Sequence, residues 1–128
     1  MEPTKRNENT PPTRHYDLED RTLLFAKDVM ALVDRLPRTI VNIEIAKQLV
    51  RASGSVGANY IEANESLGRK DFLMKIRISR KESKESRYWL KLVTVDDSDK
   101  PTQDRLTQES TELMKIFGAI LRNATRTN

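Results

Sequence analysis

The clearest pattern in the chain lies in the stretch of residues 69–91, which read RKDFLMKIRISRKESKESRYWLK. Nine of the 23 basic residues lie in it, and at about 100° per residue eight of the nine fall within roughly 120° of helical arc. The opposite side carries apolar residues, namely Phe72, Ile76, Trp89 and Leu90, and Val93 continues this side just after the stretch. This segregation predicts one long amphipathic helix with a core side and a cationic side.

The same periodicity predicts three further helices in the chain. The four predicted helices cover about residues 17–36, 40–67, 69–95 and 101–125. Asp17 is a suitable N-cap, Pro37 and Gly68 break the pattern, and Pro101 suits a first helical turn. No strand-like alternation is present. Four long helices with short connections predict an all-α, antiparallel up-down-up-down four-helix bundle over residues 17–126.

The N-terminal segment, residues 1–16, is polar and contains three prolines, so we expect a disordered arm. It lacks the apolar core of a signal peptide, and the chain has no run of apolar residues long enough to span a membrane. We therefore expect no membrane association and a cytoplasmic location.

Composition argues against catalysis. The 128 residues suit a single domain with a net charge of +4, and there is no cysteine. The only histidine, His15, lies in the expected arm, so the folded part lacks the components of a histidine triad or a histidine metal site. We expect a protein that is not an enzyme, with no catalytic residues, no metal and no cofactor.

The first two helices raise questions of packing. Leu23, Leu24 and Met30 point away from the apolar stripe of the first helix, so an oligomer would cover what a monomer exposes. Gly54 and Gly57 each cost roughly 1 kcal/mol inside the second helix, and close packing is the expected compensation. The apolar face of that helix is about 180° wide and predicts contact with more than one neighbour. It consists of Ile43, Ala46, Leu49, Val50, Val56, Tyr60, Ile61 and Leu67.

Polar residues interrupt the core side of the second and third helices. They form a predicted polar seam of Ser53, Asn64, Lys75, Ser79, Glu82 and Ser86. A buried charge without a partner costs several kcal/mol, so we expect Lys75 to pair with Glu82 or Asn64. The seam is either a proton-transfer or ligand site, or a polar network that fixes helix register; the second interpretation is favoured because no catalytic constellation accompanies it.

The eight aligned cations, called here the basic stripe, are Arg69, Lys70, Arg77, Arg80, Lys81, Lys84, Arg87 and Lys91. Over about 33 Å of helix they can follow a phosphate backbone, although a charged helix face is more often simply solvated. The predicted nucleic-acid-binding residues are Arg77, Arg80, Lys81, Lys84, Arg87, Tyr88 and Lys91, with Tyr88 stacking on a base. The alternative is a protein interaction scaffold, in which the stripe meets the acidic first helix of a neighbour or another acidic partner.

Two segments carry a family resemblance. Residues 55–63, SVGANYIEA, and residues 81–90, KESKESRYWL, together with the pair Asp71 and Phe72, resemble the bacterial four-helix-bundle family encoded in 23S rRNA intervening sequences. The positions that match are Asn59, Glu62, Asp71, Phe72, Glu82, Glu85, Tyr88, Trp89 and Leu90. This chain departs from many relatives at Ala63, where they have glycine, and at Ser79, Ser83 and Ser86, where alanine is common.

The resemblance implies a homo-oligomer, namely a homopentamer. A related branch comprises the accessory variability proteins of diversity-generating retroelements, which bind nucleic acid and a reverse transcriptase through a basic surface. The resemblance therefore implies structured RNA or DNA as a partner, and a reverse transcriptase only if this chain is a retroelement member. We expect a non-catalytic, oligomeric accessory factor.

Overall fold

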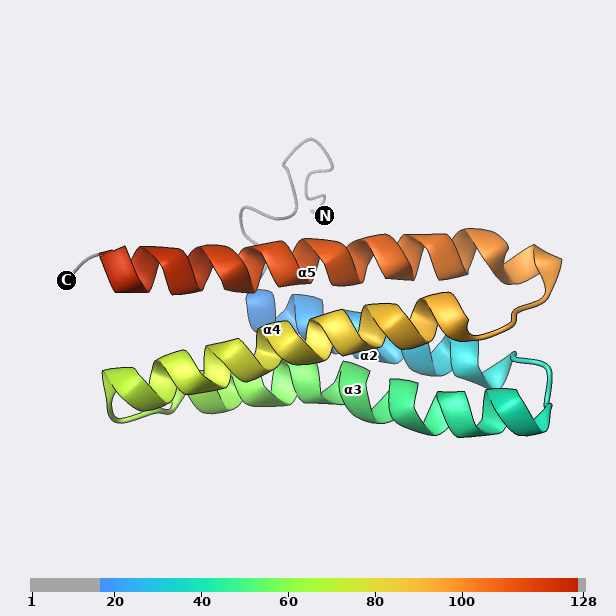
Figure 1. The fold of residues 1–128 in the computed structure, drawn as a ribbon, viewed down its shortest axis with the longest axis horizontal. Helices are drawn as coiled ribbons and strands as arrows, with labels where there is room; N and C mark the ends of the chain where they lie inside the picture. The colour runs from blue at the N-terminus through green and yellow to red at the C-terminus, as the bar shows by residue number, and fades with distance from the viewer. Residues whose placement is uncertain (1–16, 127–128) are drawn as a thin grey trace, which may run out of the picture.

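A computed structural model describes residues 17–126 of the chain; the expected arm, residues 1–16, lies outside this range. The described residues form four α-helices and one short 3-10 helix (Figure 1). Their bounds are α2 Leu18–Asp34, α3 Ile40–Asn64, α4 Arg69–Leu92, η1 Asp97–Asp99 and α5 Lys100–Arg126. Successive helices run in opposite directions along one long axis, which confirms the predicted all-α up-down-up-down bundle.

The helix ends follow local chemistry. The Asp17 carboxylate accepts a hydrogen bond from the Glu19 backbone N–H at 3.0 Å, and the Thr39 hydroxyl accepts one from the Asn42 N–H at 3.0 Å. Both bonds satisfy amides that a helix start leaves unpaired. The second and third helices end earlier than predicted, at Asn64 and Leu92, and the residues after them form non-helical connections instead. Pro101 lies within the first turn of α5, as expected.

One apolar core runs along the bundle. It is lined by side chains that are almost completely buried: Phe25, Val29, Leu32, Leu49, Val56, Ile76, Leu90, Leu106, Leu113 and Phe117. The Tyr60 ring of α3 also contacts the Phe117 ring of α5, with 6.0 Å between their centroids. The core therefore draws on all four helices.

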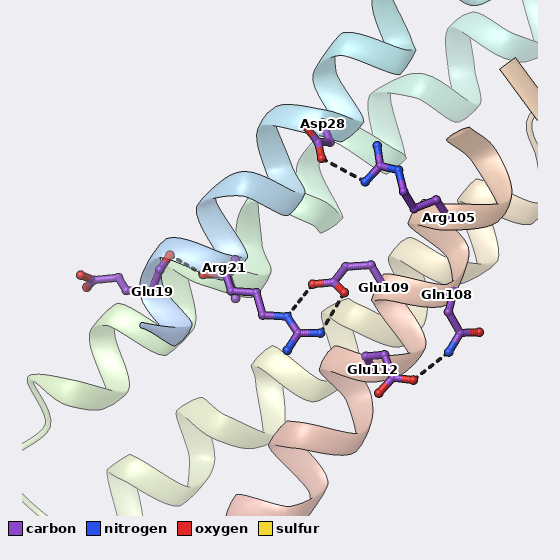
Figure 2. A network of polar contacts seen from close by, with 8 residues as sticks. Glu19, Arg21, Asp28, Arg105, Gln108, Glu109 and Glu112 are labelled. Atoms are coloured by element: carbon purple, nitrogen blue, oxygen red, sulfur yellow. Dashed lines mark hydrogen bonds and ion pairs between the residues drawn. The ribbon is translucent and has the colours of Figure 1, made fainter. Parts of the chain in front are cut away.

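Charged contacts close the bundle between its first and last helices. Figure 2 shows that Arg21 of α2 donates twice to Glu109 of α5, from Nε at 2.7 Å and from a terminal nitrogen at 2.9 Å. Further along the two helices, Arg105 of α5 donates to Asp28 of α2 at 3.3 Å. A bidentate arginine–carboxylate pair fixes geometry as well as charge, so these contacts set the register of α2 against α5.

The outer faces of α2 and α3 expose apolar side chains. Leu23, Leu24 and Met30 are exposed, as predicted. The wide apolar face of α3 does contact both α2 and α4, but one edge of it is uncovered. The exposed fractions are 41% for Ile43, 38% for Val50 and 45% for Ile61, and Leu67 is fully exposed because the helix ends before it.

Candidate functional site

The basic stripe lies on the outer surface of α4. Arg77, Arg80, Lys81, Lys84 and Lys91 are exposed, and within residues 17–126 none of these five is ion-paired with a carboxylate. By contrast, Lys75 on the opposite side of the same helix is paired. The structure thus leaves most of the predicted nucleic-acid-binding residues with free charges on one face.

The acidic groups of α4 lie away from the stripe. Asp71 accepts a hydrogen bond from the Ser66 hydroxyl in the turn between α3 and α4, at 2.9 Å. The Glu85 carboxylate lies 4.0 Å from Arg51 of α3, and Glu82 is buried. Because the carboxylates are drawn toward α3, the outward face of α4 keeps its positive charge.

Two members of the basic stripe are less free than the rest, because one is hydrogen-bonded and the other is half-buried. Arg69 donates to the backbone carbonyl of Ala124, near the end of α5. Arg87 is half-buried, and its Nε is buried with no hydrogen-bond partner among the described residues. Arg69 thus lies at the border between α4 and α5, where one end of the stripe meets α5.

A small hollow lies beside Arg87, near the C-terminal end of α4. It has a volume of about 250 Å³ and is lined by Arg87, Tyr88, Lys91 and Leu92. Tyr88 is 60% exposed, and its ring meets the Trp89 ring nearly edge-on, with 5.0 Å between centroids and 75° between planes. An exposed aromatic ring between two cations has the composition of a base-stacking site.

Helix α5 adds cations that the sequence analysis missed. Lys115 and Arg122 are exposed and flank Gly118 at three- and four-residue spacing, so the three share one side of α5. Arg80 of α4 reaches this side, because its Nε lies 4.0 Å from the position that a Cβ on Gly118 would take. The clue in the sequence was the seven-residue interval between Lys115 and Arg122, with a glycine between them.

The predicted polar seam is partly assembled. Ser53, Ser79, Glu82 and Ser86 are buried where α3 and α4 meet. Ser79 donates to the Val56 carbonyl at 2.9 Å, and the hydroxyls of the other two serines donate to carbonyls of their own helices. These bonds favour the structural interpretation of the seam, because they leave no serine donor free for a ligand.

Two expectations about the seam are wrong. Asn64 is exposed at the last position of α3, where the helix ends. Lys75 does not pair with Glu82 or Asn64; its ammonium lies 2.9 Å from the carboxylate of Glu62, and it is only partly buried. The hydrogen bond and the charge of Glu62 raise the pKa of Lys75 above its ordinary value of 10.5, against a small opposing effect of burial. The sequence could not show which acid on α3 faces Lys75.

Glu82 is the remaining anomaly of the seam. Its side chain is 6% exposed, and its Oε1 has no hydrogen-bond partner within residues 17–126.

Within residues 17–126, no three acidic or histidine side chains are grouped to hold a metal ion. None of the four helices is long and apolar enough to cross a membrane, within the residues described.

Comparison with known proteins accounts for this architecture. The family model described as 23S rRNA-intervening sequence protein matches residues 14–119. The chain belongs to this family. A similar solved structure is a protein of unknown function from the S23 ribosomal protein family of Bacteroides thetaiotaomicron. It is 29% identical, with a TM-score of 0.69, and the match covers 82% of this chain and 98% of the other. No curated protein matches this chain.

Proposed function

We propose that this member of the 23S rRNA-intervening sequence protein family is a non-catalytic accessory factor that binds nucleic acid through α4. The observation that carries the proposal is the row of five exposed cations, Arg77, Arg80, Lys81, Lys84 and Lys91, none of which is ion-paired within residues 17–126. Cations already paired with carboxylates gain little from a phosphate, whereas free ones release condensed counterions from the nucleic acid.

Structured RNA is the proposed ligand. A straight helix presents its cations along one line, which suits contacts with successive phosphates of a folded backbone more than readout of base edges. Tyr88, exposed beside Arg87 and Lys91, provides a stacking surface for one unpaired base at the end of that line. No cofactor takes part, and a reverse transcriptase is a partner only if the chain serves a retroelement.

The proposal is tested by reversing the charge of three exposed stripe residues, Arg77→Glu, Lys81→Glu and Lys84→Glu, in one variant. We expect affinity for an RNA hairpin to fall roughly 100-fold, and the slope of log affinity against log salt to become shallower by about 2 to 3, because about three phosphate contacts are lost. Fluorescence anisotropy across a salt series measures both.

A matched control makes the same change in charge elsewhere. Lys27→Glu, Arg38→Glu and Lys47→Glu alter exposed cations on α2, the α2–α3 loop and α3. This variant should keep most of the affinity, since its cations lie off the stripe. Equal losses of RNA affinity in the two variants would mean that net charge, and not the stripe, determines binding. Equal binding of the RNA hairpin, duplex DNA and heparin by the unaltered protein would identify the stripe as a generic polyanion surface.

The scaffold function remains the second candidate, supported by the uncovered apolar edge of α2 and α3. Leu23 and Met30 lie seven residues apart on α2, and Ile43 and Val50 lie seven residues apart on α3. A seven-residue spacing keeps side chains on one seam, which suits a further helix packed against it. Together with the family resemblance, this edge supports the proposed homo-oligomer, with a pentamer as the expected state.

Assembly would also strengthen nucleic-acid binding. In a pentamer the net charge of +4 repeats to about +20, and several weak contacts then act together through effective concentration. Sedimentation equilibrium at micromolar concentration decides the point: a monomer would contradict the oligomer. A pentamer that dissociates as salt increases would show that the stripe is used between subunits, which favours the scaffold function.

A further inference from the structure

Two arginines from different helices approach the same point where α5 packs against α4. Gly118 of α5 is buried, and the position that a Cβ on it would occupy lies 3.6 Å from a terminal nitrogen of Arg122 and 4.0 Å from Nε of Arg80. The two guanidinium groups therefore lie near the same glycine, one from α4 and one from α5.

Neither arginine has an anionic partner in the described part of the chain. Arg80 and Arg122 form no ion pair or side-chain hydrogen bond within residues 17–126. By contrast, α5 forms two ion pairs with α2, namely Arg21 with Glu109 and Arg105 with Asp28. Two guanidinium groups held near one point repel each other, and an anion held between them removes that repulsion.

We propose that Arg80 and Arg122 form a phosphate-binding site over Gly118, which holds one phosphodiester of a bound nucleic acid. The inference rests on the proposed function, and it adds the position of one phosphate contact and the participation of α5 in binding. Guanidinium groups suit a phosphate because their fixed fork of N–H donors matches its oxygen atoms. Glycine suits the floor of the site because it has no side chain to compete for the space that the anion takes.

The surrounding charges favour a polymer over an isolated phosphate. Lys115 lies beyond Gly118 on the same side of α5, and Lys84 continues the basic stripe on α4. Both are exposed and without a carboxylate partner among the described residues. Exposed cations on both helices beside the arginine pair give the neighbouring phosphates of a chain their own contacts. The nucleic acid then contacts both helices instead of following α4 alone.

The decisive variant is Arg122→Gln, because Arg122 lies outside the basic stripe. We expect RNA hairpin affinity to fall about three- to tenfold and the salt slope to become shallower by about 1, in line with the loss of one phosphate contact. Arg122→Lys keeps the charge but loses the fork, so it should restore the slope and only part of the affinity. Lys27→Gln, an exposed cation on α2, is the charge-matched control and should change neither.

A second variant fills the site from within. Gly118→Glu places a carboxylate beside both guanidinium groups, where it should occupy them and weaken RNA binding at least as much as Arg122→Gln. Asn123→Glu adds the same charge at an exposed position of α5 with little expected effect. Circular dichroism spectra and melting curves establish that both variants fold.

The outcomes separate the site from the proposed function. If Arg122→Gln and Gly118→Glu bind RNA as the unaltered protein does, while charge reversal of Arg77, Lys81 and Lys84 abolishes binding, the arginine site is wrong and the function stands. If the unaltered protein does not bind RNA, the nucleic-acid occupant is overturned. A titration with inorganic phosphate, followed by NMR of the arginine Nε–H groups, then tells whether Arg80 and Arg122 bind a free phosphate instead.

Discussion

Gly57 of α3 and Thr22 of α2 lie in direct contact. A Cβ added at Gly57 would lie 2.7 Å from Oγ1 and 3.1 Å from Cβ of Thr22. Thr22 is only 1% exposed, and its hydroxyl donates to the Glu19 carbonyl at 3.0 Å, so its side chain has little freedom to move. The absence of a side chain at Gly57 is therefore what lets the two helices approach closely.

Gly57→Ala should destabilise the protein by about 1 to 3 kcal/mol, as overpacking of a filled core does. Alanine is the better helix former by roughly 1 kcal/mol, but the contact with Thr22 outweighs that gain. Urea unfolding followed by circular dichroism measures the change. Combining Gly57→Ala with Thr22→Ala should cost less than the sum of the single changes, because the closer of the two contacting atoms is removed.

Gly54→Ala is the matched control, three residues earlier on the same helix. Gly54 is exposed and a Cβ there would meet nothing within 4 Å, so alanine should stabilise the protein by about 0.5 to 1 kcal/mol. Opposite signs at the two glycines would establish the contact with Thr22. A stabilising effect at both positions would mean that α2 and α3 separate at no cost.

These two glycines also show which features of the fold could be predicted from the sequence and which could not. Periodicity predicted four helices and their order, because burial of one face imposes a repeat that any helix displays. It gave Gly54 and Gly57 the same explanation, close packing, yet only Gly57 faces another helix. Which of two neighbouring glycines is covered depends on the rotation of α3 against α2, and that is a property of the assembled bundle.

The candidate site, too, was only partly predictable from the sequence. The basic stripe was predictable because its residues share one helix, so spacing alone aligns them. Arg122 was missed because its relation to Arg80 exists only after α5 packs on α4. Lys75 was assigned the wrong partner for the same reason: Glu62 and Asn64 are two residues apart on α3, and the pairing of two helices decides which one Lys75 meets.

Asn42 joins three parts of the chain at one end of the bundle. Its side-chain nitrogen donates to the Pro37 carbonyl at 3.0 Å and to the Thr94 carbonyl at 2.9 Å, and its oxygen accepts from the Thr94 N–H at 3.1 Å. It is almost fully buried. Asn42→Ala should cost about 2 to 4 kcal/mol, because it leaves these backbone groups unpaired.

Asn42→Asp provides a sharper test of the same cluster in urea unfolding. Aspartate fills the same volume, but as a carboxylate it has no N–H to donate to the two carbonyls. We expect it to destabilise the protein at least as much as alanine does. A loss below about 1 kcal/mol for both variants would contradict the structural role of Asn42.

Replacing Glu82 should stabilise the protein. Its Oε1 is buried without a hydrogen-bond partner among the described residues, and such a group costs about 1 to 3 kcal/mol. Glu82→Met keeps a similar volume and removes the polar atoms, so we expect a higher melting temperature. Glu85→Met, at a half-exposed position of the same helix, should have little effect. If Glu82→Met destabilises instead, the carboxylate has a partner outside the described residues, such as a neighbouring subunit.

The ion pair between Lys75 and Glu62 predicts a specific dependence of stability on pH. The pKa of Lys75 in the folded protein is raised above its ordinary 10.5, first by the hydrogen bond to Glu62 and then by the charge of Glu62. A raised folded pKa means that folding favours the protonated ammonium. The stabilisation is therefore complete below about pH 10 and is lost as the pH rises through the folded pKa.

The variant Glu62→Gln isolates this contribution from the other groups that titrate in alkali. The unaltered protein should melt at a higher temperature than Glu62→Gln between about pH 7 and 10, and the two should converge above that range as Lys75 loses its proton. Glu65→Gln, an exposed acid just after the end of α3, should show no such convergence. A difference between Glu62→Gln and the unaltered protein that persists to about pH 12 would assign the effect of Glu62 to packing instead of charge.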